Sequence, residues 1–171
     1  ELAIESSVSG GNTFSFIVDF ELAESVAGDE STVPAESLSG LTVLIAASHA
    51  ANGRILADFV ARWDMKAEVA DTGRSALLAI EAAHTGGRTF DFVLAEVHLA
   101  DIDGFDLCKR LAVGAQYGEP KVFLVTSTAA LSEADRMRPF GPTGLLAKPI
   151  FPSVLLDAFS ESVAQPLSPN S

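Results

Sequence analysis

The chain has 171 residues, of which 11 are Lys or Arg and 23 are Asp or Glu, so its formal net charge is −12. This acidic balance argues against a nucleic-acid partner, because binding to phosphate backbones needs clustered basic residues. A single cysteine excludes an intramolecular disulfide and a multi-cysteine zinc site. No apolar stretch approaches the ~20 residues that cross a bilayer, and no apolar leader opens the chain. We therefore expect a cytoplasmic protein without direct membrane contact. If the chain is part of a longer protein, we expect any membrane anchor to lie outside this sequence.

The N-terminal part differs in composition from the rest, with eight acidic residues and no Lys or Arg in the first forty. Alternating side chains around a glycine-rich turn at residues 9–12 predict a β-hairpin within residues 1–20. Residues 21–40 are acidic and small, which predicts a solvated linker. We expect one globular domain over residues 41–163 and a disordered tail over residues 164–171.

Within the globular part, apolar strand-like runs alternate five times with amphipathic helical runs. The predicted strands are Thr42–Ala46, Lys66–Ala70, Phe92–Val97, Lys121–Thr126 and Gly144–Ala147. The apolar residues that share a helical face are Ile55, Leu56, Phe59, Val60 and Trp63; Ala76, Leu77 and Ile80; Phe105, Cys108 and Leu111; and Val154, Leu155, Ala158 and Phe159. A further helix is expected near Ser132–Arg138. This alternation predicts an α/β fold with a parallel sheet covered on both faces and its functional crevice at the carboxyl ends of the strands.

Four landmarks in residues 41–163 resemble, in order and spacing, those of the response-regulator receiver domain. They are Val43-Leu44-Ile45-Ala46, Phe92-Val93-Leu94-Ala95-Glu96 followed by Asp103-Gly104, Leu124-Val125-Thr126-Ser127, and Lys148-Pro149. The resemblance implies a doubly wound, five-stranded parallel sheet of the flavodoxin-like type, with helices on both faces and strand order 2-1-3-4-5 within the domain. It also implies a role in a two-component phosphorelay.

In that family an acidic pair after the first strand holds Mg²⁺, an aspartate ending the third strand accepts a phosphoryl group, and a Thr or Ser and a Lys end the fourth and fifth strands. At these positions the chain has Ala47 and Ser48, Glu96, Thr126 and Lys148. Mg²⁺ prefers oxygen ligands that include one or two carboxylates, so losing two of three predicts no Mg²⁺ binding and no cofactor. The extra methylene of Glu96 also displaces the carboxylate, and a misplacement of about 1 Å can cost ~100-fold in rate. We therefore predict a degenerate receiver without catalytic residues.

Two hypotheses for Glu96 remain open at this stage. It could pair with Lys148 and imitate a phosphorylated state permanently, or it could be a drifted residue whose buried charge needs an ammonium group nearby. Many receivers carry an aromatic residue three places before the Lys, where this chain has Leu145, so the usual coupling to Thr126 is not expected. Asp103 is predicted to cap the following helix.

The function predicted from these residues is a phosphorylation-independent regulatory module that docks onto a histidine-kinase core or another phosphorelay domain. The expected docking surface combines the fourth helix, fifth strand and fifth helix of the domain. One alternative is a working phosphoacceptor that uses Glu96 or Asp101 and phosphorylates itself. Another is a ligand-sensing degenerate receiver in which Arg136 and Arg138 contact an anion.

The N-terminal residues carry a second resemblance. Residues 4–16, Ile-Glu-Ser-Ser-Val-Ser-Gly-Gly-Asn-Thr-Phe-Ser-Phe, resemble the closing hairpin of a histidine-kinase ATP-binding domain. The glycine boxes that contact ATP in that family are absent from the sequence. The resemblance implies a fragment of a hybrid sensor histidine kinase, in which a closing hairpin and a linker precede the degenerate receiver. This chain alone is not expected to be an enzyme.

Overall fold

The computed structural model describes residues 2–7, 11–19, 35–114, 117–127 and 142–164. The chain divides into two compact units, Glu1–Glu30 and Ser31–Ser171. No helix in the described ranges combines the length and the apolar character that a membrane span requires.

The first unit is a β-hairpin, as predicted. Strand β1 (Leu2–Ser7) pairs antiparallel with β2 (Gly11–Phe16). Ile4 lies opposite Phe14 in this register, and both side chains are more than half exposed. Because side chains alternate between the faces of a strand, these two residues lie on one face of the hairpin and leave it apolar.

The second unit contains a five-stranded parallel sheet whose order confirms the predicted topology. Its strands are β3 (Thr42–Ala46), β4 (Lys66–Ala70), β5 (Phe92–Glu96), β6 (Lys121–Ser127) and β7 (Gly144–Lys148). They are arranged as β4-β3-β5-β6-β7, which is order 2-1-3-4-5 within the domain. The central strand β5 is buried at all five residues, which explains its continuous apolar sequence.

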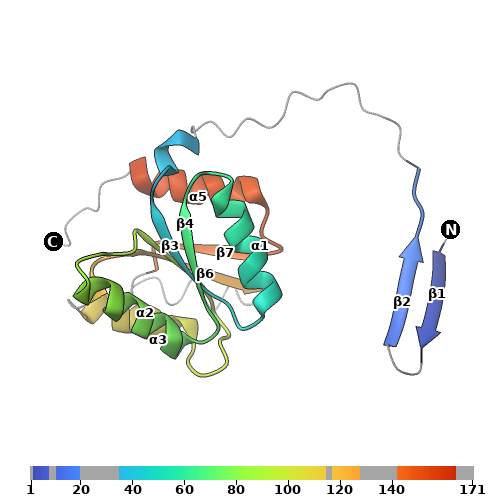
Figure 1. The fold of residues 1–171 in the computed structure, drawn as a ribbon, viewed down its shortest axis with the longest axis horizontal. Coiled ribbons are helices and arrows are strands. Elements are labelled where there is room, and N and C mark those ends of the chain that lie inside the picture. Colours follow the sequence, from blue (N-terminus) through green and yellow to red (C-terminus); the bar gives the residue numbers. More distant parts are fainter. Residues whose placement is uncertain (1, 8–10, 20–34, 115–116, 128–141, 165–171) are drawn as a thin grey trace. The chain divides into compact units, whose positions relative to one another are not determined.

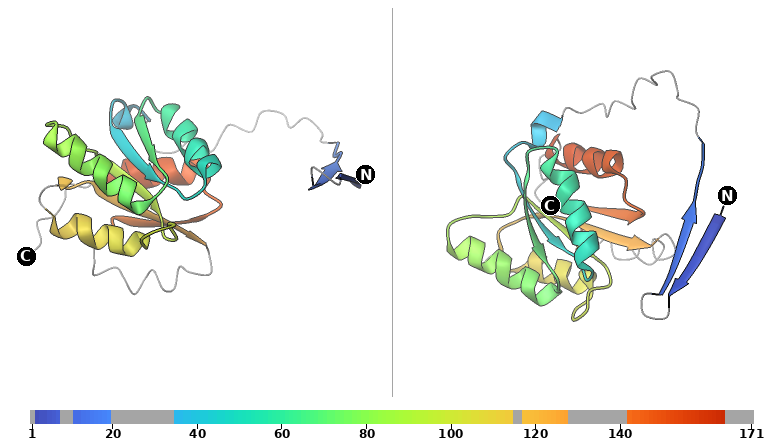
Figure 2. Two further views of the ribbon diagram at one scale, coloured as in Figure 1. Left: turned by 60° about the horizontal axis from the view of Figure 1, so that its bottom comes forward. Right: turned by 45° about the vertical axis from the view of Figure 1, so that its right-hand side comes forward.

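The helices form a layer on each face of the sheet (Figure 1). Helices α1 (Ala50–Ala61) and α5 (Pro152–Ala164) cover one face, and α2 (Gly73–Thr85) and α3 (Gly104–Val113) cover the other. Figure 2 shows the same separation from two other directions. The predicted helix near Ser132–Arg138, including both arginines of the anion hypothesis, lies outside the described residues.

The globular unit begins earlier in the chain than the sequence predicts. A short 3-10 helix, η1 (Ala35–Leu38), lies inside the segment 21–40 that was expected to be linker, and Leu38 is fully buried. Gly40, at φ +79°, donates a backbone hydrogen bond to the Asp64 carbonyl. Leu38 has no large apolar neighbour at strand or helix spacing in this acidic, small-residue segment, so the sequence does not predict its burial.

Candidate functional site

The carboxyl ends of the parallel strands bring the predicted site residues to one edge of the sheet. Ala47 and Ser48 follow β3, Glu96 ends β5, Thr126 lies near the end of β6, and Lys148 ends β7. Ala47, Glu96 and Thr126 are buried, whereas the Lys148 side chain is 43% exposed. This edge is where doubly wound sheets place their functional crevice.

The carboxylate of Glu96 accepts hydrogen bonds from three donors. Its Oε2 accepts from the backbone N–H of Ser48 over 3.0 Å. Its Oε1 accepts from Asn52 Nδ2 over 3.0 Å and from Lys148 Nζ over 2.5 Å. Charged hydrogen bonds of this kind compensate a buried carboxylate for the water it has lost.

These contacts keep Glu96 ionised. Burial acts to raise the pKa of Glu96, but the hydrogen bonds from Lys148, Ser48 and Asn52, together with the attraction of the ammonium, outweigh it and lower the pKa below the ordinary value of 4.5. The site therefore holds a carboxylate anion and a paired ammonium at neutral pH.

Asn52 is the member of this site that sequence analysis missed. It lies in the first turn of α1, one turn after the Ala47-Ser48 loop, and its side chain faces Glu96. An asparagine in the first turn of a helix has many ordinary uses, so its type and spacing alone carry no specific signal.

Two further side chains tie the loops around the site to one another. The hydroxyl of Ser48 donates to the backbone carbonyl of His98 over 3.0 Å. Asp101 accepts from the backbone N–H groups of Gly73, Arg74 and Ile102, each over 2.8 Å. Asp101 thus caps the N-terminus of α2 from a different loop, and the loops after β3, β4 and β5 are linked by hydrogen bonds.

Asp101, which one alternative hypothesis names as a phosphoacceptor, accepts hydrogen bonds from backbone N–H groups. Burial acts to raise its pKa, but hydrogen bonds from the N–H groups of Arg74, Gly73 and Ile102 lower it below the ordinary value. The lone pairs of both carboxylate oxygens are directed at backbone donors. Asp103 behaves as predicted, because its Oδ1 accepts from Phe105 N–H at the start of α3.

Thr126 stands apart from this network. Its side chain is 3% exposed, and within the described part of the chain its hydroxyl has no hydrogen-bond partner. Leu145, which stands at the position of the usual aromatic residue, is partly buried and packs with the α2 and α3 side of the core. Glu96 and Lys148 therefore pair without participation of the Thr126 hydroxyl.

A groove of about 490 Å³ opens beside the Glu96 carboxylate. One wall is α1, with Asn52, Ile55 and Phe59, and the other is formed by Lys148 at the end of β7 and Ile150 in the connection that follows. Ile55 belongs to the predicted apolar face of its helix, yet its side chain is 51% exposed. The cavity is mostly apolar, and its polar groups gather at the Glu96 end.

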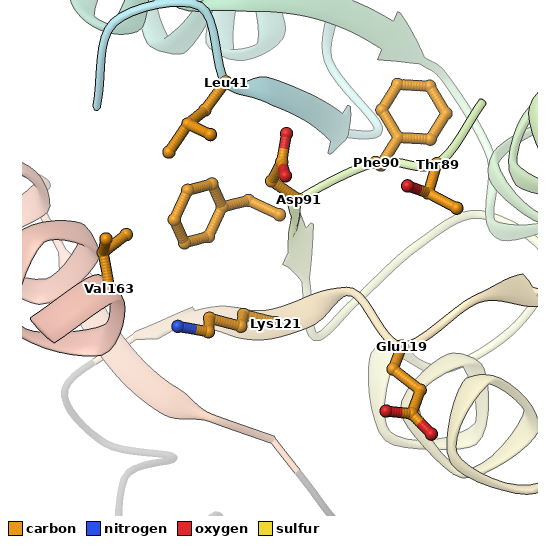
Figure 3. A pocket seen from close by; sticks show the side chains of 8 residues that line it. Leu41, Thr89, Phe90, Asp91, Glu119, Lys121 and Val163 are labelled. Atoms are coloured by element: carbon orange, nitrogen blue, oxygen red, sulfur yellow. The ribbon is translucent and has the colours of Figure 1, made fainter. Parts of the chain in front are cut away.

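A second pocket, of about 310 Å³, lies at the opposite edge of the sheet (Figure 3). Two of its charged side chains, Asp91 and Lys121, already serve the fold. Asp91 accepts from both the N–H and the hydroxyl of Thr42, over 2.8 Å each. Lys121 reaches toward α5, which carries Val163 in Figure 3, and donates to the Ser162 carbonyl. Asp91 and Lys121 are therefore engaged in structural contacts.

The chemistry of the donor set at the Glu96 edge does not fit Mg²⁺. Ala47 offers no side-chain ligand, and Ser48 offers a neutral hydroxyl in place of a carboxylate. Glu96 is the remaining carboxylate of the family pattern, and three N–H donors already occupy it. Among the described residues, no group of three or more His, Cys, Asp or Glu side chains could hold a metal ion.

Known proteins similar to this chain include receiver domains and sensor kinases. The family model for the response regulator receiver domain matches residues 43–160. The sensor histidine kinase AruS of Pseudomonas aeruginosa is 29% identical over 163 residues, covering 94% of this chain and 15% of that protein. The virulence sensor protein BvgS of Bordetella bronchiseptica is 27% identical, covering 98% of this chain and 14% of that protein. The chain thus spans about a seventh of the length of these relatives.

Solved structures agree on the fold. The chemotaxis response regulator CheY4 of Vibrio cholerae superposes with a TM-score of 0.62 at 22% identity, covering 73% of this chain and 99% of that one. The receiver domain of a sensor histidine kinase from Pseudomonas aeruginosa PAO1, solved with magnesium coordinated in its active site cleft, superposes with a TM-score of 0.64 at 15% identity, covering 74% and 100%. From the fold, the strand-end site and the family match over most of its length, the chain belongs to the response regulator receiver domain family.

Proposed function

We propose that this receiver domain is a regulatory module of a two-component phosphorelay whose state does not depend on phosphorylation. One observation carries the proposal: the Glu96 carboxylate, at the phosphoacceptor position, is engaged by N–H donors from Ser48, Asn52 and Lys148. A nucleophile must present a free lone pair to the incoming phosphorus. Three of the roughly four lone-pair sites of the Glu96 carboxylate are engaged, and these contacts lower its nucleophilicity.

The mismatch with Mg²⁺ supports the same proposal. Phosphoryl transfer relies on electrostatic stabilisation of the charge on the transferring group, and a metal ion supplies much of it. Ala47 and Ser48 replace the acidic pair, and Lys148 is already paired with Glu96. The remaining groups therefore lack the cationic charge that would assist acylation of a carboxylate.

The Thr126 hydroxyl helps to distinguish the two hypotheses for Glu96, imitation of a phosphorylated state and compensation of a buried charge. A permanent imitation of the phosphorylated state would recruit the Thr126 hydroxyl together with Lys148. The absence of a partner for this hydroxyl among the described residues favours the simpler hypothesis, that Lys148 compensates a buried charge. The proposed module is thus fixed in one state by an internal ion pair.

We propose a histidine-kinase core or another phosphorelay domain as the partner. The matches to AruS and BvgS cover 94% and 98% of this chain, and these relatives are a sensor histidine kinase and a virulence sensor protein. The fourth helix of the expected docking surface lies outside the described residues. Of its other parts, β7 and α5, helix α5 carries exposed apolar side chains at Val154 and Val163, which suit a protein partner.

The same matches support the origin of the hairpin in a hybrid sensor kinase. A match to BvgS that covers 98% of this chain extends into residues 2–16. The exposed Ile4 and Phe14 give one face of the hairpin an apolar surface that a larger domain would cover. Hydrogen exchange of this chain should be fast in the hairpin and slow in Val43–Ala46 and Phe92–Glu96. Strong protection of the hairpin would contradict this origin.

The central experiment compares the parent chain with a reconstructed site. Intact mass is measured after incubation with acetyl phosphate and Mg²⁺. The triple variant Ala47→Asp, Ser48→Asp, Glu96→Asp restores the family carboxylates and should gain one phosphoryl mass, whereas the parent should remain unmodified. The single variant Glu96→Asp is the matched control and should also remain unmodified, because the metal ligands are still missing.

The outcomes separate the alternatives. Phosphorylation of the parent at Glu96 would overturn the proposal. A triple variant that folds, binds Mg²⁺ and stays unmodified would show that the site is placed wrongly. If the triple variant does not fold, the parent chain is titrated with millimolar Mg²⁺ while its amide NMR shifts are recorded. A saturable shift at Ala47, Ser48 and Glu96 would contradict the proposal, and the absence of such a shift would support it.

A further inference from the structure

The groove beside Glu96 has the composition of a small-molecule site. Its volume of about 490 Å³ falls within the range of ligand pockets, about 300–1,000 Å³. Ligand pockets are mostly apolar with a few converging polar groups, and here Asn52 and Lys148 converge on Glu96. The cavity also lies at the carboxyl ends of the strands, where open α/β sheets bind ligands.

The α1 wall presents a polar head followed by an apolar stripe. Asn52, Ile55, Leu56 and Phe59 are spaced i, i+3, i+4 and i+7, so they lie along one side of the helix. The distance along the axis from Asn52 to Phe59 is about 10 Å. Ile150 lies on the opposite wall, two residues after Lys148. The groove therefore runs from a polar end to an apolar end.

The unused hydrogen-bonding capacity at the polar end consists mainly of N–H donors. Lys148 has three donors, gives one to Glu96 within the described part of the chain, and keeps its side chain 43% exposed. Asn52 gives one of its two N–H groups to Glu96. The Glu96 carboxylate is 6% exposed and already accepts three hydrogen bonds, so an incoming group meets the ammonium more readily than the carboxylate.

We propose that this groove binds a small monocarboxylic acid with an apolar chain, whose carboxylate accepts hydrogen bonds from Lys148 and Asn52 while the chain lies over Ile55, Phe59 and Ile150. An amine of the same shape would be repelled by the Lys148 ammonium, and an alcohol would lack the charge that strengthens the hydrogen bond. Such a ligand would join α1 to the connection before α5, two segments that otherwise form separate walls.

This inference goes beyond the proposed function, because binding of a ligand in the groove does not depend on whether Glu96 can be phosphorylated. Both use Lys148, but in different ways: one as the partner of Glu96, the other through its exposed donors. The groove can therefore fail to bind a monocarboxylic acid while the parent chain stays unphosphorylated as proposed. Equally, the groove can bind the acid while the parent chain becomes phosphorylated.

The test titrates the full chain with hexanoate, octanoate and decanoate while amide shifts and calorimetry are recorded. We expect saturable shifts confined to the groove, at Ile55, Phe59 and Ile150. Each added methylene should tighten Kd by roughly three- to fourfold until the groove is filled. Octylamine and octanol, which have the same chain with other head groups, should bind about tenfold more weakly than octanoate.

Variants separate the groove from unspecific apolar binding. Ile55→Gln should weaken octanoate binding, while the control Leu78→Gln, at an apolar residue of α2 that is 61% exposed, should leave it unchanged. The double variant Glu96→Gln, Lys148→Gln removes both charges together. It should weaken octanoate about tenfold and leave octanol unaffected.

Three results would each overturn the proposal. They are dispersed or unsaturable shifts with octanoate, binding of octylamine as tight as that of octanoate, and equal losses in Ile55→Gln and Leu78→Gln. Circular dichroism of each variant establishes that it is folded before its affinity is compared.

Discussion

Lys148 Nζ donates a hydrogen bond to Glu96 Oε1 over 2.5 Å, although the strands that carry the two residues are separated by β6. The lysine side chain is 43% exposed and the glutamate side chain 6%. The pair therefore joins a half-solvated cation to a buried anion. Loss of the cation is expected to be the more damaging change, because it leaves a charge that water cannot reach.

Replacement of Lys148 tests this asymmetry. Lys148→Met should lower the free energy of unfolding by about 1–3 kcal/mol, since a buried acceptor loses its charged partner. Adding Glu96→Gln should recover most of that loss by removing the unpaired charge. Urea denaturation near neutral pH measures both values.

A matched lysine serves as the control for that cycle. Lys109 has the same side-chain exposure of 43% but pairs with the exposed Asp106 on α3. Lys109→Met should change the free energy of unfolding by less than about 0.5 kcal/mol. Equal effects of the two substitutions would mean that the contact to Glu96 contributes no more than a surface ion pair.

Acid sensitivity follows from the lowered pKa of Glu96. The folded state stabilises the ionised carboxylate, so this contribution is complete above the unfolded pKa and disappears as the pH falls through the folded pKa, below 4.5. The free energy of unfolding should therefore decrease more between about pH 6 and about pH 3 in the parent chain than in Glu96→Gln. Parallel pH profiles for the two proteins would contradict the assigned ionisation.

The capping role of Asp101 gives a third prediction. Asp101→Ala leaves the N–H groups of Gly73 and Arg74 without their acceptor and should lower the free energy of unfolding by about 1 kcal/mol. Hydrogen exchange should increase at the first turn of α2. Asp106→Ala, an exposed acid on α3, is the control and should have little effect. If Asp101→Ala leaves exchange in α2 unchanged, the capping interaction is not important in solution.

Cys108 should be inert in the folded protein. It is buried, and burial raises the pKa of its thiol to about 11, so the reactive thiolate is scarce at neutral pH. An aromatic disulfide reagent should label it only after denaturation. A cysteine at the exposed Ala112, placed by Ala112→Cys in a Cys108→Ala background, should react at once. Rapid labelling of the native parent would indicate that α3 opens locally.

The strands and the meeting point of the site residues were predictable from sequence. Each strand of the sheet begins at the predicted residue and ends within one residue of it. In β3, β5 and β6, burial leaves a continuous apolar run that is easy to recognise. Glu96 and Lys148 were expected to meet because parallel strands bring their carboxyl ends to one edge.

What the sequence did not predict depends on contacts between distant residues. Asn52 bonds to Glu96 across 44 positions, and Asp101 bonds to Gly73 across 28. Neither partner is implied by local spacing. Ile55 fits the apolar stripe of its helix yet lines an open groove, because whether a helical face is covered depends on where the neighbouring segment passes.

The separation of these partners along the chain also has a kinetic consequence. The contacts of Glu96 with Ser48, Asn52 and Lys148 span 48, 44 and 52 positions. Long loops must close before such contacts can form, so we expect this network to be weak in the folding transition state. Its loss should then accelerate unfolding and leave the folding rate nearly unchanged. The ion pair would thus set how long the domain stays folded more than how quickly it forms.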